Sequence, residues 1–422
     1  MRLAFKFKPR MSHKQLEIIK ELSWHTSKLY NIANYKIRNK DKKPIYSRMD
    51  KYFKKNWHCK YLHSHNRQHC LKQLAKDWKS FFNSIKDYKK NPKKYKATPR
   101  PPKFKNMNNN PNEIVFTNQA VKIKKNNLLF SLSKLIKEKY VVKKLKFELP
   151  KAVQSYINFD KLQQIRIKKD KLNNSWYLLI IYKTAENKEK IQKENNNKSN
   201  IMAIDLGLDN LATLTFKDSD KSYIINGKPV KSKNAYFNKE IARLSGIRMK
   251  QVGSRKFKNT KNIKRLRLKR RNYVDDYFHK ASRKIINLAL DNDVKTIVIG
   301  DLKDIKQNMN YNKSFVQIPI QKLVELIKYK AKLENIKVVK INESFTSGCS
   351  AIDLEKLNRN NYDKSRRIER GLFKTEDKII NSDVNGSLNI LRKYLKDKCI
   401  PEMIDQIRDN GLVNSPSRLR VS

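Results

Sequence analysis

The sequence has few cysteines and no long apolar segment. Only four of its 422 residues are cysteine (Cys59, Cys70, Cys349 and Cys399), and they are scattered along the chain. Such sparse cysteine suits a reducing compartment and argues against a fold held by disulfides. No apolar segment is long enough to cross a bilayer, and the first residues do not have the pattern of a signal peptide. We therefore expect neither a membrane-spanning helix nor secretion.

Acidic residues are also scarce. The chain has 39 Asp and Glu against 97 Lys and Arg, which gives a formal net charge of +58. A compact chain with this excess repels itself unless a polyanion is bound, so nucleic acid is the expected partner. A basic protein of the membrane surface is the competing class, and the absence of a spanning segment disfavours it. The length predicts two or three domains.

One of the few acids, Asp205, stands at the end of an apolar run. It follows Ile201–Ile204 and precedes Leu206 and Gly207. A short apolar run bounded by turn signals predicts a buried strand, and residues 210–216 predict a second strand that forms a hairpin with it. A carboxylate on such a strand needs a partner. An aspartate that caps a turn is the simpler interpretation of an isolated match.

Further acids stand in similar places downstream. The apolar run 294–299 leads into Gly300 and Asp301, and a predicted strand at Ile336–Ile341 leads into Glu343. Residues 318–333 predict an amphipathic helix between them, and Asp383 lies in the first turn of a last predicted helix. Carboxylates gathered at one sheet edge stay ionised only beside a divalent cation. Two such ions about 3.5–4 Å apart form the arrangement that hydrolyses phosphodiesters.

Three ordered segments resemble the RuvC motifs of the TnpB family: Asp205-Leu206-Gly207, Ile299-Gly300-Asp301-Leu302 and Asp383-Val384-Asn385-Gly386. Phe345-Thr346-Ser347, between the second and third, strengthens a resemblance that covers nearly the whole chain. TnpB proteins are transposon-encoded, RNA-guided DNA nucleases related to type V CRISPR effectors. The resemblance implies a metal-dependent DNA endonuclease that cuts next to a short adjacent motif. It also implies two Mg²⁺ or Mn²⁺ ions, a guide RNA derived from the transposon end, double-stranded target DNA, and a location in the prokaryotic cytoplasm with the nucleoid.

The fold implied by the resemblance is an α/β multidomain one. We expect a wedge β-barrel over residues 1–10 and 100–183, a helical recognition lobe over 11–99, a linker over 184–199 and an RNase H-like (RuvC) nuclease domain over 200–400. Within the nuclease domain we expect a basic helical insertion at 235–290 and a degenerate zinc-ribbon loop at 346–380. Residues 401–422 are expected to form a loosely ordered basic tail.

The middle acid departs from the usual family pattern, in which a glutamate precedes Asp-Leu. Gly300 stands at that position, and Asp301 is one residue later, where a strand side chain points to the opposite face. Some relatives supply the acid from the next strand, just before Phe-Thr-Ser, where this chain has Glu343. We therefore predict Asp205, Glu343 and Asp383 as the catalytic and metal-binding residues, with Asp301 as the runner-up.

Two basic stretches are the predicted nucleic-acid contacts. Residues 99–105 form a rigid tract whose phenylalanine could stack on a base, although a solvated linker fits equally well. Residues 235–290 are almost all positive over several helical turns, which favours phosphate binding. The candidate residues are Arg100, Lys103, Phe104, Lys105, Arg255, Lys264, Arg265, Arg267, Arg270 and Arg271.

Zinc is not expected. Typical family members carry four ribbon cysteines between the second and third motifs, but Cys349 is the only cysteine between Glu343 and Asp383. A single thiolate cannot hold zinc tetrahedrally. The histidines and cysteines between residues 58 and 70 fit no standard zinc spacing, so a polar helix entry is favoured there over a metal site.

Two other functions stay open at this point. One is a nuclease-silent, RNA-guided repressor that binds DNA without cutting it. The other is a guide-free RuvC-type nuclease, which would leave the N-terminal half unexplained. The sequence does not distinguish a monomer from a dimer.

Overall fold

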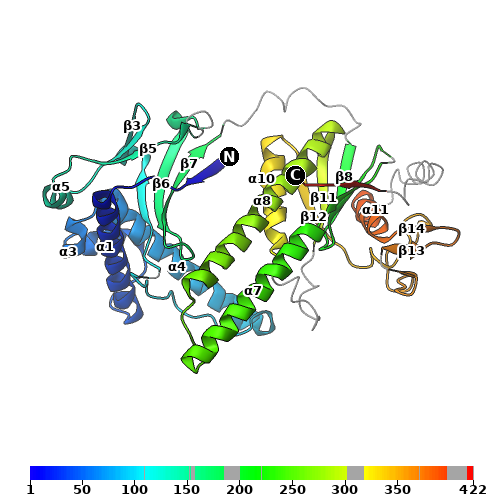
Figure 1. The fold of residues 1–422 in the computed structure, drawn as a ribbon, viewed down its shortest axis with the longest axis horizontal. Helices are drawn as coiled ribbons and strands as arrows, with labels where there is room; N and C mark the ends of the chain where they lie inside the picture. Colours follow the sequence, from blue (N-terminus) through cyan, green and yellow to red (C-terminus); the bar gives the residue numbers. More distant parts are fainter. Residues whose placement is uncertain are drawn as a thin grey trace. The chain divides into compact units, whose positions relative to one another are not determined.

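The computed structural model covers the whole chain and divides into two compact units, Met1–Glu186 and Asn187–Ser422 (Figure 1). The structure describes all residues except 109, 152, 154–156, 185–199, 220, 302–317, 370, 397–415 and 422. The predicted linker, residues 184–199, lies almost wholly outside the described residues.

Two long helices dominate the first part of unit one. Helix α1 (His13–Arg38) begins with a capping box, in which Ser12 and Gln15 exchange side-chain and backbone hydrogen bonds. Helix α4 (Ser64–Lys90) follows, and the side chain of its N-cap residue His63 accepts a hydrogen bond from the backbone N–H of His65. Two short helices that the sequence analysis missed, α2 (Tyr46–Phe53) and α3 (Trp57–Lys60), lie between them.

The strands of unit one form two antiparallel sheets. The first has the order β1-β7-β6-β2, from β1 (Arg2–Phe7), β7 (Trp176–Lys183), β6 (Leu162–Lys169) and β2 (Ile114–Thr117). The second has the order β3-β4-β5, from β3 (Val121–Lys124), β4 (Asn127–Phe130) and β5 (Leu145–Glu148). Strands β6 and β7 pair as an antiparallel hairpin. Along the chain, helix α5 (Lys134–Tyr140) connects β4 to β5.

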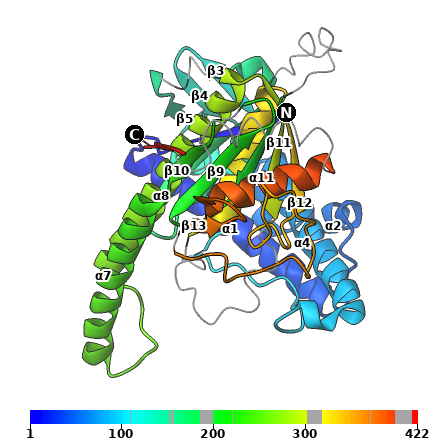
Figure 2. The same cartoon turned by 90° about the vertical axis from the view of Figure 1, so that its right-hand side faces the viewer.

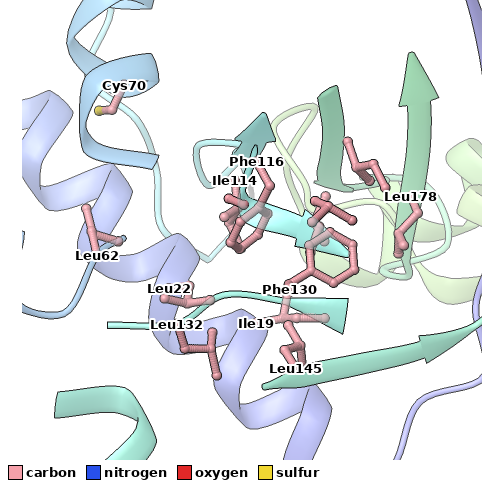
Figure 3. Close-up of a cluster of buried hydrophobic side chains, with 14 of the residues drawn as sticks. Ile19, Leu22, Leu62, Cys70, Ile114, Phe116, Phe130, Leu132, Leu145 and Leu178 are labelled. Atoms are coloured by element: carbon pink, nitrogen blue, oxygen red, sulfur yellow. The ribbon is translucent and has the colours of Figure 1, made fainter. Parts of the chain in front are cut away.

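The strands of the expected barrel region form two sheets, and no ladder within the described residues joins them. Apolar side chains connect them instead. Phe116 of the first sheet contacts Phe130 of the second edge-on, with ring centroids 4.9 Å apart, and Phe130 contacts Phe147 in the same way. Ile19 and Leu22 of α1 join this core, which Figure 3 shows from close by. Helices and sheets of unit one thus share one apolar interior.

Unit two is built on a six-stranded mixed sheet with the order β12-β11-β8-β9-β10-β15. The hairpin of β8 (Asn200–Asp205) with β9 (Asn210–Phe216) is confirmed, and β10 (Tyr223–Asn226) continues it antiparallel. On the other side of β8, β11 (Val294–Asp301) and β12 (Lys337–Asn342) run parallel to it. The carboxyl ends of β8, β11 and β12 therefore meet at one sheet edge.

Helices cover both faces of this sheet (Figure 1). Helices α8 (Lys261–Asp291) and α10 (Ile320–Leu333) bury their apolar faces against one side. Helix α11 (Ser382–Leu395) packs on the other side, where Val384 and Leu388 belong to the same buried cluster as Ala203 and Val298. This arrangement brings the first turn of α11 to the edge where the parallel strands end.

The predicted basic insertion at 235–290 is partly wrong. It consists of α7 (Lys228–Val252) and α8, which run side by side (Figures 1 and 2). The second half of α8, from Val274 to Ala289, is a core helix because its apolar side chains are buried against the sheet. Only α7 and the first part of α8 extend away from the sheet (Figure 2). The prediction failed because basic exposed residues alternate with apolar buried ones on the same helix.

The last described residues of the chain form a strand rather than a loose tail. Strand β15 (Ser417–Leu419) pairs in parallel with β10, and the backbone N–H of Ser417 donates to the Ser222 carbonyl over 3.0 Å. Leu419 and Val421 pack on the same core as α8. The expectation of a loosely ordered tail is thus wrong for these residues, because apolar contacts and a ladder fix them.

Candidate active site

The predicted acids lie at one edge of the unit-two sheet. Asp205 is the last residue of β8 and Asp301 the last of β11. Glu343 directly follows β12, and Asp383 lies in the first turn of α11. Acids from four segments of the chain therefore converge at the strand ends.

The side chain of Glu343 occupies the space above Gly300. A Cβ atom built on Gly300 would collide with Oε2 of Glu343 and lie 2.9 Å from Cδ1 of Ile390. Gly300 pairs with Ile341 in the β11–β12 ladder, two residues before Glu343. The carboxylate of Glu343 therefore stands where a side chain at position 300 would point.

Asp205 makes a similarly close approach to α11. A Cβ atom at Gly386 would lie only 2.7 Å from Oδ2 of Asp205. Burial, followed by the negative charges of Asp383 and Glu343, raises the pKa of Asp205 to about 7, and Arg367 opposes this shift. Charges act this strongly only at short range, so the three predicted carboxylates share one local environment.

Glu343 and Asp301 also influence each other. Burial, with a smaller contribution from Asp301, raises the pKa of Glu343 to about 7. Asp301 lies beside Asn342 in the β11–β12 ladder, and its Oδ1 is 3.8 Å from Nζ of Lys340. Asp301 is therefore near the site, but its carboxylate has a lysine beside it, whereas the negative charge of Glu343 contributes to the raised pKa of Asp205.

Asp383 is held by its own helix and by β9. Asn381 caps α11, and its Oδ1 accepts hydrogen bonds from the backbone N–H groups of Asp383 and Val384. Nδ2 of Asn210 donates to Oδ2 of Asp383 over 2.5 Å. Asn210 is a residue that the sequence analysis missed, because nothing in a short β-rich run distinguishes its first residue.

A groove of about 780 Å³ opens beside Asp383. Its cationic lining residues come from three separate segments: Lys228 and Lys231 from α7, Arg367 from the loop before β13, and Arg418 from β15. Lys231 is paired with Asp209, 2.7 Å away. Of the three predicted site acids, Asp383 lines this groove together with the four cations, and such cations suit a substrate made of phosphates.

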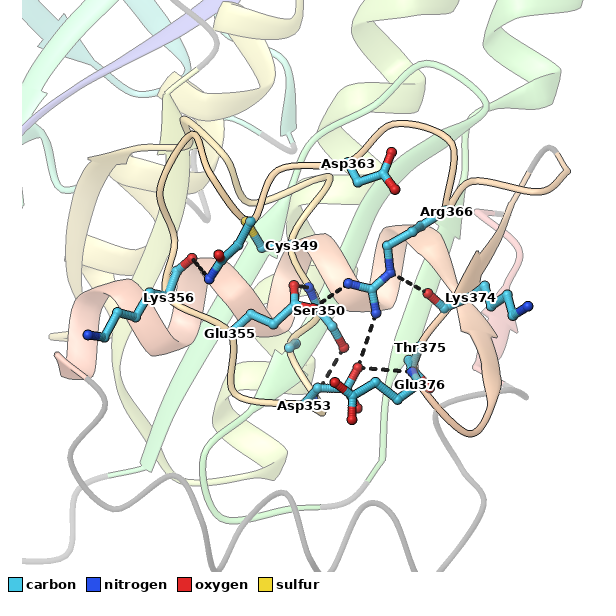
Figure 4. A network of polar contacts seen from close by, with 12 residues as sticks. Cys349, Ser350, Asp353, Glu355, Lys356, Asp363, Arg366, Lys374, Thr375 and Glu376 are labelled. Carbon is cyan, nitrogen blue, oxygen red and sulfur yellow. Dashed lines mark hydrogen bonds and ion pairs between the residues drawn. The ribbon is translucent and has the colours of Figure 1, made fainter.

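The loop between Glu343 and α11, the predicted degenerate ribbon, is held by an ion-pair cluster around Arg366 (Figure 4). The Arg366 guanidinium contacts Glu355 and lies 3.2 Å from Oδ2 of Asp353, while its Nε donates to the carbonyl of Lys374 over 2.8 Å. Arg366 also lies over the ring of Phe373. These contacts tie the loop to the hairpin of β13 (Leu372–Lys374) and β14 (Ile379–Asn381).

Polar side chains of α11 hold the other end of this loop. The amide of Asn385 donates to the Cys349 carbonyl and accepts from the Ala351 N–H, and Asn389 donates to the carbonyls of Thr346 and Cys349. Arg392, which is fully buried, donates to the Ser350 and Glu355 carbonyls. Since Arg367 adjoins Arg366, this network also determines where Arg367 stands in the groove.

The first predicted nucleic-acid stretch lies along α1 in unit one. Asn34 and Arg38 donate to the carbonyl of Pro102, and Asn31 exchanges two hydrogen bonds with the backbone of Lys105. The guanidinium of Arg38 lies over the ring of Phe104, which remains 46% exposed. The tract is therefore a docked segment and not a free linker, and its phenylalanine presents an open face beside a cation.

The predicted basic residues of the second stretch, residues 235–290, differ in their exposure. Four of its predicted residues are exposed: Arg255, Lys264, Arg265 and Arg267. Arg270 and Arg271 are partly buried, and Nε of Arg270 donates to Oδ1 of Asn234 over 2.6 Å. Arg270 therefore also holds α8 against α7.

The histidines of unit one form a packed cluster. Nδ1 of His25 and Nδ1 of His58 share a hydrogen bond of 3.0 Å, and the His25 ring stacks on Tyr61. Burial, with the neighbouring His58, lowers the pKa of His25 to about 4. His65 instead contacts the hydroxyl of Thr117. These contacts agree with the predicted polar helix entry.

The donor set at the sheet edge is chemically suited to magnesium, which prefers oxygen ligands. Asp205, Glu343 and Asp383 would supply them, and the raised pKa values of the first two reflect burial and repulsion that a cation would relieve. Within the described residues, no three His, Cys, Asp or Glu side chains already stand as a metal-ligand group. Metal binding would therefore require these side chains to adjust.

Comparisons with known proteins bear on the same regions. Residues 181–306 match the OrfB_IS605 family, described as a probable transposase. Residues 321–390, which include α10, β12, the Arg366 loop and the start of α11, match the family described as Cas12f1-like, TNB domain. The chain is related to the TnpB and Cas12f proteins. The predicted TnpB resemblance is confirmed at this level.

Two relatives illustrate the extent of the similarity. The CRISPR-associated endodeoxyribonuclease Cas12f1 of Sulfoacidibacillus thermotolerans is 30% identical over 247 residues, or 56% of this chain and 54% of that protein. The TnpB-like protein ORF457 of Acidianus two-tailed virus is 24% identical over 405 residues, or 89% of this chain and 83% of that protein. The match to the Cas12f1 thus spans about half of that relative's length.

A solved structure supports the fold class. CasPhi-2 (Cas12j) bound to crRNA aligns with a TM-score of 0.55 and 10% identity, covering 95% of this chain and 99% of that one. At this identity the likeness concerns the fold alone, a mixed α/β multidomain one. No helix in the described part of the chain has the length and apolar character needed to cross a membrane.

Proposed function

We propose that this protein is an RNA-guided, metal-dependent DNA endonuclease whose nuclease site comprises Asp205, Glu343 and Asp383. The observation that carries the proposal is the carboxylate of Glu343 in the space above Gly300, beside Asp205. The sheet of unit two supports an RNase H-like assignment, since three antiparallel strands are followed by two strands parallel to the first. The relatives named as TnpB-like and Cas12f1 proteins support the same activity.

Each site residue has a proposed role. Asp205, Glu343 and Asp383 would hold the metal through their carboxylate oxygens. Bound magnesium or manganese would activate the attacking water and stabilise the leaving oxygen. Asn210 orients the Asp383 carboxylate, and Asn381 fixes the first turn of α11 that carries it. Arg367 offers positive charge to the phosphate, because it lies in the groove close enough to lower the pKa of Asp205.

Specificity would come from base pairing between a guide RNA and the target strand, with the protein reading only a short adjacent motif. We propose that unit one, with Arg38 and Phe104 on its surface, contacts these nucleic acids. We also propose that the Arg366 loop is stable without zinc, because Arg366 makes the cross-links that ribbon cysteines would otherwise make through a metal.

The test compares Glu343→Gln with Asp301→Asn in the full chain purified with its RNA. Cleavage of guide-matched DNA is measured with and without magnesium, and DNA binding is measured separately. We expect Glu343→Gln, like Asp205→Asn, to reduce cleavage by more than about 100-fold, because losing even an outer-shell partner costs 10–100-fold. Asp301→Asn should cleave within a few-fold of the wild type, and all variants should bind.

The reverse pattern, an inactive Asp301→Asn beside an active Glu343→Gln, would assign the middle acid to Asp301. A wild-type protein that binds guide-matched DNA but never cuts it would instead indicate an RNA-guided repressor. A protein that cuts without any RNA would indicate a guide-free nuclease.

A further inference from the structure

The C-terminal strand is part of the wall of the catalytic groove. Strand β15 pairs in parallel with β10, with Arg418 opposite Ile224 and Leu419 opposite Ile225. Successive side chains of a strand point to opposite faces of the sheet. Leu419 packs on the core that contains α8, while Arg418 lines the groove beside Asp383. The apolar contact of Leu419 thus anchors the strand, and its neighbour is directed to the site.

The surroundings of Arg418 would allow it to bind an anion. It is exposed, and no carboxylate of the described residues forms an ion pair with it. Lys231, in the same groove, differs because it is paired with Asp209. Arg367 also lines the groove without a carboxylate partner among the described residues, although Glu369 is a nearby lining residue. Unpaired arginines beside a carboxylate site suit phosphates, since the guanidinium binds them through two parallel hydrogen bonds.

We propose that Arg418 binds a backbone phosphate of the nucleic-acid strand that lies in this groove, so that the C-terminal strand completes the substrate site. This inference rests on the proposed nuclease function, and it adds a phosphate contact from a segment outside both matched family regions, residues 181–306 and 321–390. The groove, at about 780 Å³, has more room than one phosphate occupies. Arg418 would hold a phosphate next to the one at the carboxylates, and so position the strand for cleavage.

Arg420 supplies a matched control. It lies two residues along the same segment but lines a different cavity, of about 290 Å³, with Tyr273 and Tyr277 of α8. Both arginines are exposed, so replacing either should leave the fold unchanged, which thermal unfolding will verify. Any difference between the two variants then reports on the groove and not on net charge.

The first experiment uses photocrosslinking, which does not require cleavage. The crosslinking amino acid p-benzoylphenylalanine is placed at position 418 or at position 420 of the full chain carrying Asp205→Asn, together with its RNA and matched DNA. Position 418 should crosslink to nucleic acid and position 420 should not. Equal crosslinking at both positions, or none at 418, would overturn the proposal.

The second experiment measures cleavage at DNA concentrations below KM. Arg418→Ala should lower kcat/KM about tenfold or more, the size expected for a hydrogen bond to a charged group, and Arg418→Lys should recover part of the loss. Arg420→Ala should cleave like the wild type. An unchanged rate in Arg418→Ala would refute a role in positioning. Crosslinking at 418 in a chain that never cleaves would instead leave the phosphate contact standing and reject the nuclease.

Discussion

At the scale of single residues, two glycines make room for the carboxylates. Gly300 leaves the space that Glu343 fills, and Gly386 lets Oδ2 of Asp205 approach the surface of α11. Neither glycine has a positive φ angle, so the reason for glycine is space and not backbone conformation. Each glycine thus leaves the space that a neighbouring carboxylate occupies.

Gly300→Ala should reduce magnesium-dependent cleavage by at least about tenfold while DNA binding is retained. The added methyl group must displace Glu343 and Ile390, and overpacking of this kind costs about 1–3 kcal/mol. Cleavage rates and the free energy of unfolding are measured together. Gly246→Ala, on α7, is the control: a Cβ there has nothing within 4 Å, so it should gain about 0.5–1 kcal/mol of stability and cleave normally. Normal cleavage by Gly300→Ala would show that the position of Glu343 does not matter.

The raised pKa of Asp205, about 7, predicts a pH-dependent stability in chelator. Between the ordinary value near 4 and pH 7 the folded state binds the proton more tightly, so stability should fall as pH rises through this interval. Asp205→Asn removes this charge and should be more stable than the wild type at pH 8, by up to about 4 kcal/mol, with little difference at pH 4. Chemical unfolding across this range measures it.

Magnesium should reverse this effect in the wild type, because it binds the ionised carboxylates of the folded state. It should raise the unfolding midpoint of the wild type at pH 8 more than that of Asp205→Asn. Asp218→Asn, at an exposed position, should behave like the wild type. Equal stability of the wild type and Asp205→Asn at pH 8 would contradict the proposed shift.

At the scale of elements, the Arg366 loop connects the strand that carries Glu343 to the helix that carries Asp383. One end is fixed by Asn385, Asn389 and Arg392 of α11, and the other by Arg366. Because Arg367 is the neighbour of Arg366, any loosening of the cluster also moves a cation of the groove. The loop therefore couples local stability to the geometry of the site.

Arg366→Ala should destabilise the loop by about 3 kcal/mol, because it leaves Asp353 and Glu355 without their partner. Hydrogen exchange of residues 343–381 should accelerate, while exchange in unit one should not change. Arg359→Ala, an exposed arginine of the same loop, is the control and should have no effect.

Wild-type protein dialysed against a mild chelator should contain no stoichiometric zinc, and one tightly bound zinc per chain would show that a metal holds this loop.

At the scale of the whole molecule, the basic residues behind the net charge of +58 have different roles. Some cations stabilise the fold, as Arg366 and Arg392 do through buried contacts. Others, such as Lys264 and Arg265, are exposed on α8, away from the sheet. Only the exposed cations can release counterions when nucleic acid binds.

Nucleic-acid binding should therefore weaken steeply with salt, by about 10³–10⁵-fold between 50 and 200 mM if about 6–10 phosphates are neutralised. Replacing Lys264, Arg265 and Arg267 with alanine should reduce the slope of log K against log salt by about three. Replacing Lys122, Lys124 and Lys125, three exposed lysines at strand β3, removes the same charge and should change the slope much less. Equal effects of the two triple variants would show that total charge, and not the α8 contacts, governs binding.

Much of this protein could be predicted from the order of its residues. Strands β6–β9, β11 and β12, the capping box of α1 and the first turn of α11 all follow from local patterns, because apolar period and capping chemistry are properties of neighbouring residues. The nucleic-acid partner was inferred from charge alone. The placement of Glu343 over Gly300 was a hypothesis that required a resemblance to choose between two acids.

Only the tertiary structure decided what distant segments do together. The pairing of β12 beside β11 determines that Glu343 stands over Gly300, and the pairing of β15 with β10 brings Arg418 to the groove. Likewise, the burial of one half of α8 separates a core helix from a basic one. Such contacts join residues far apart in the chain, and their free energy comes from burial and sheet pairing that no local window of sequence contains.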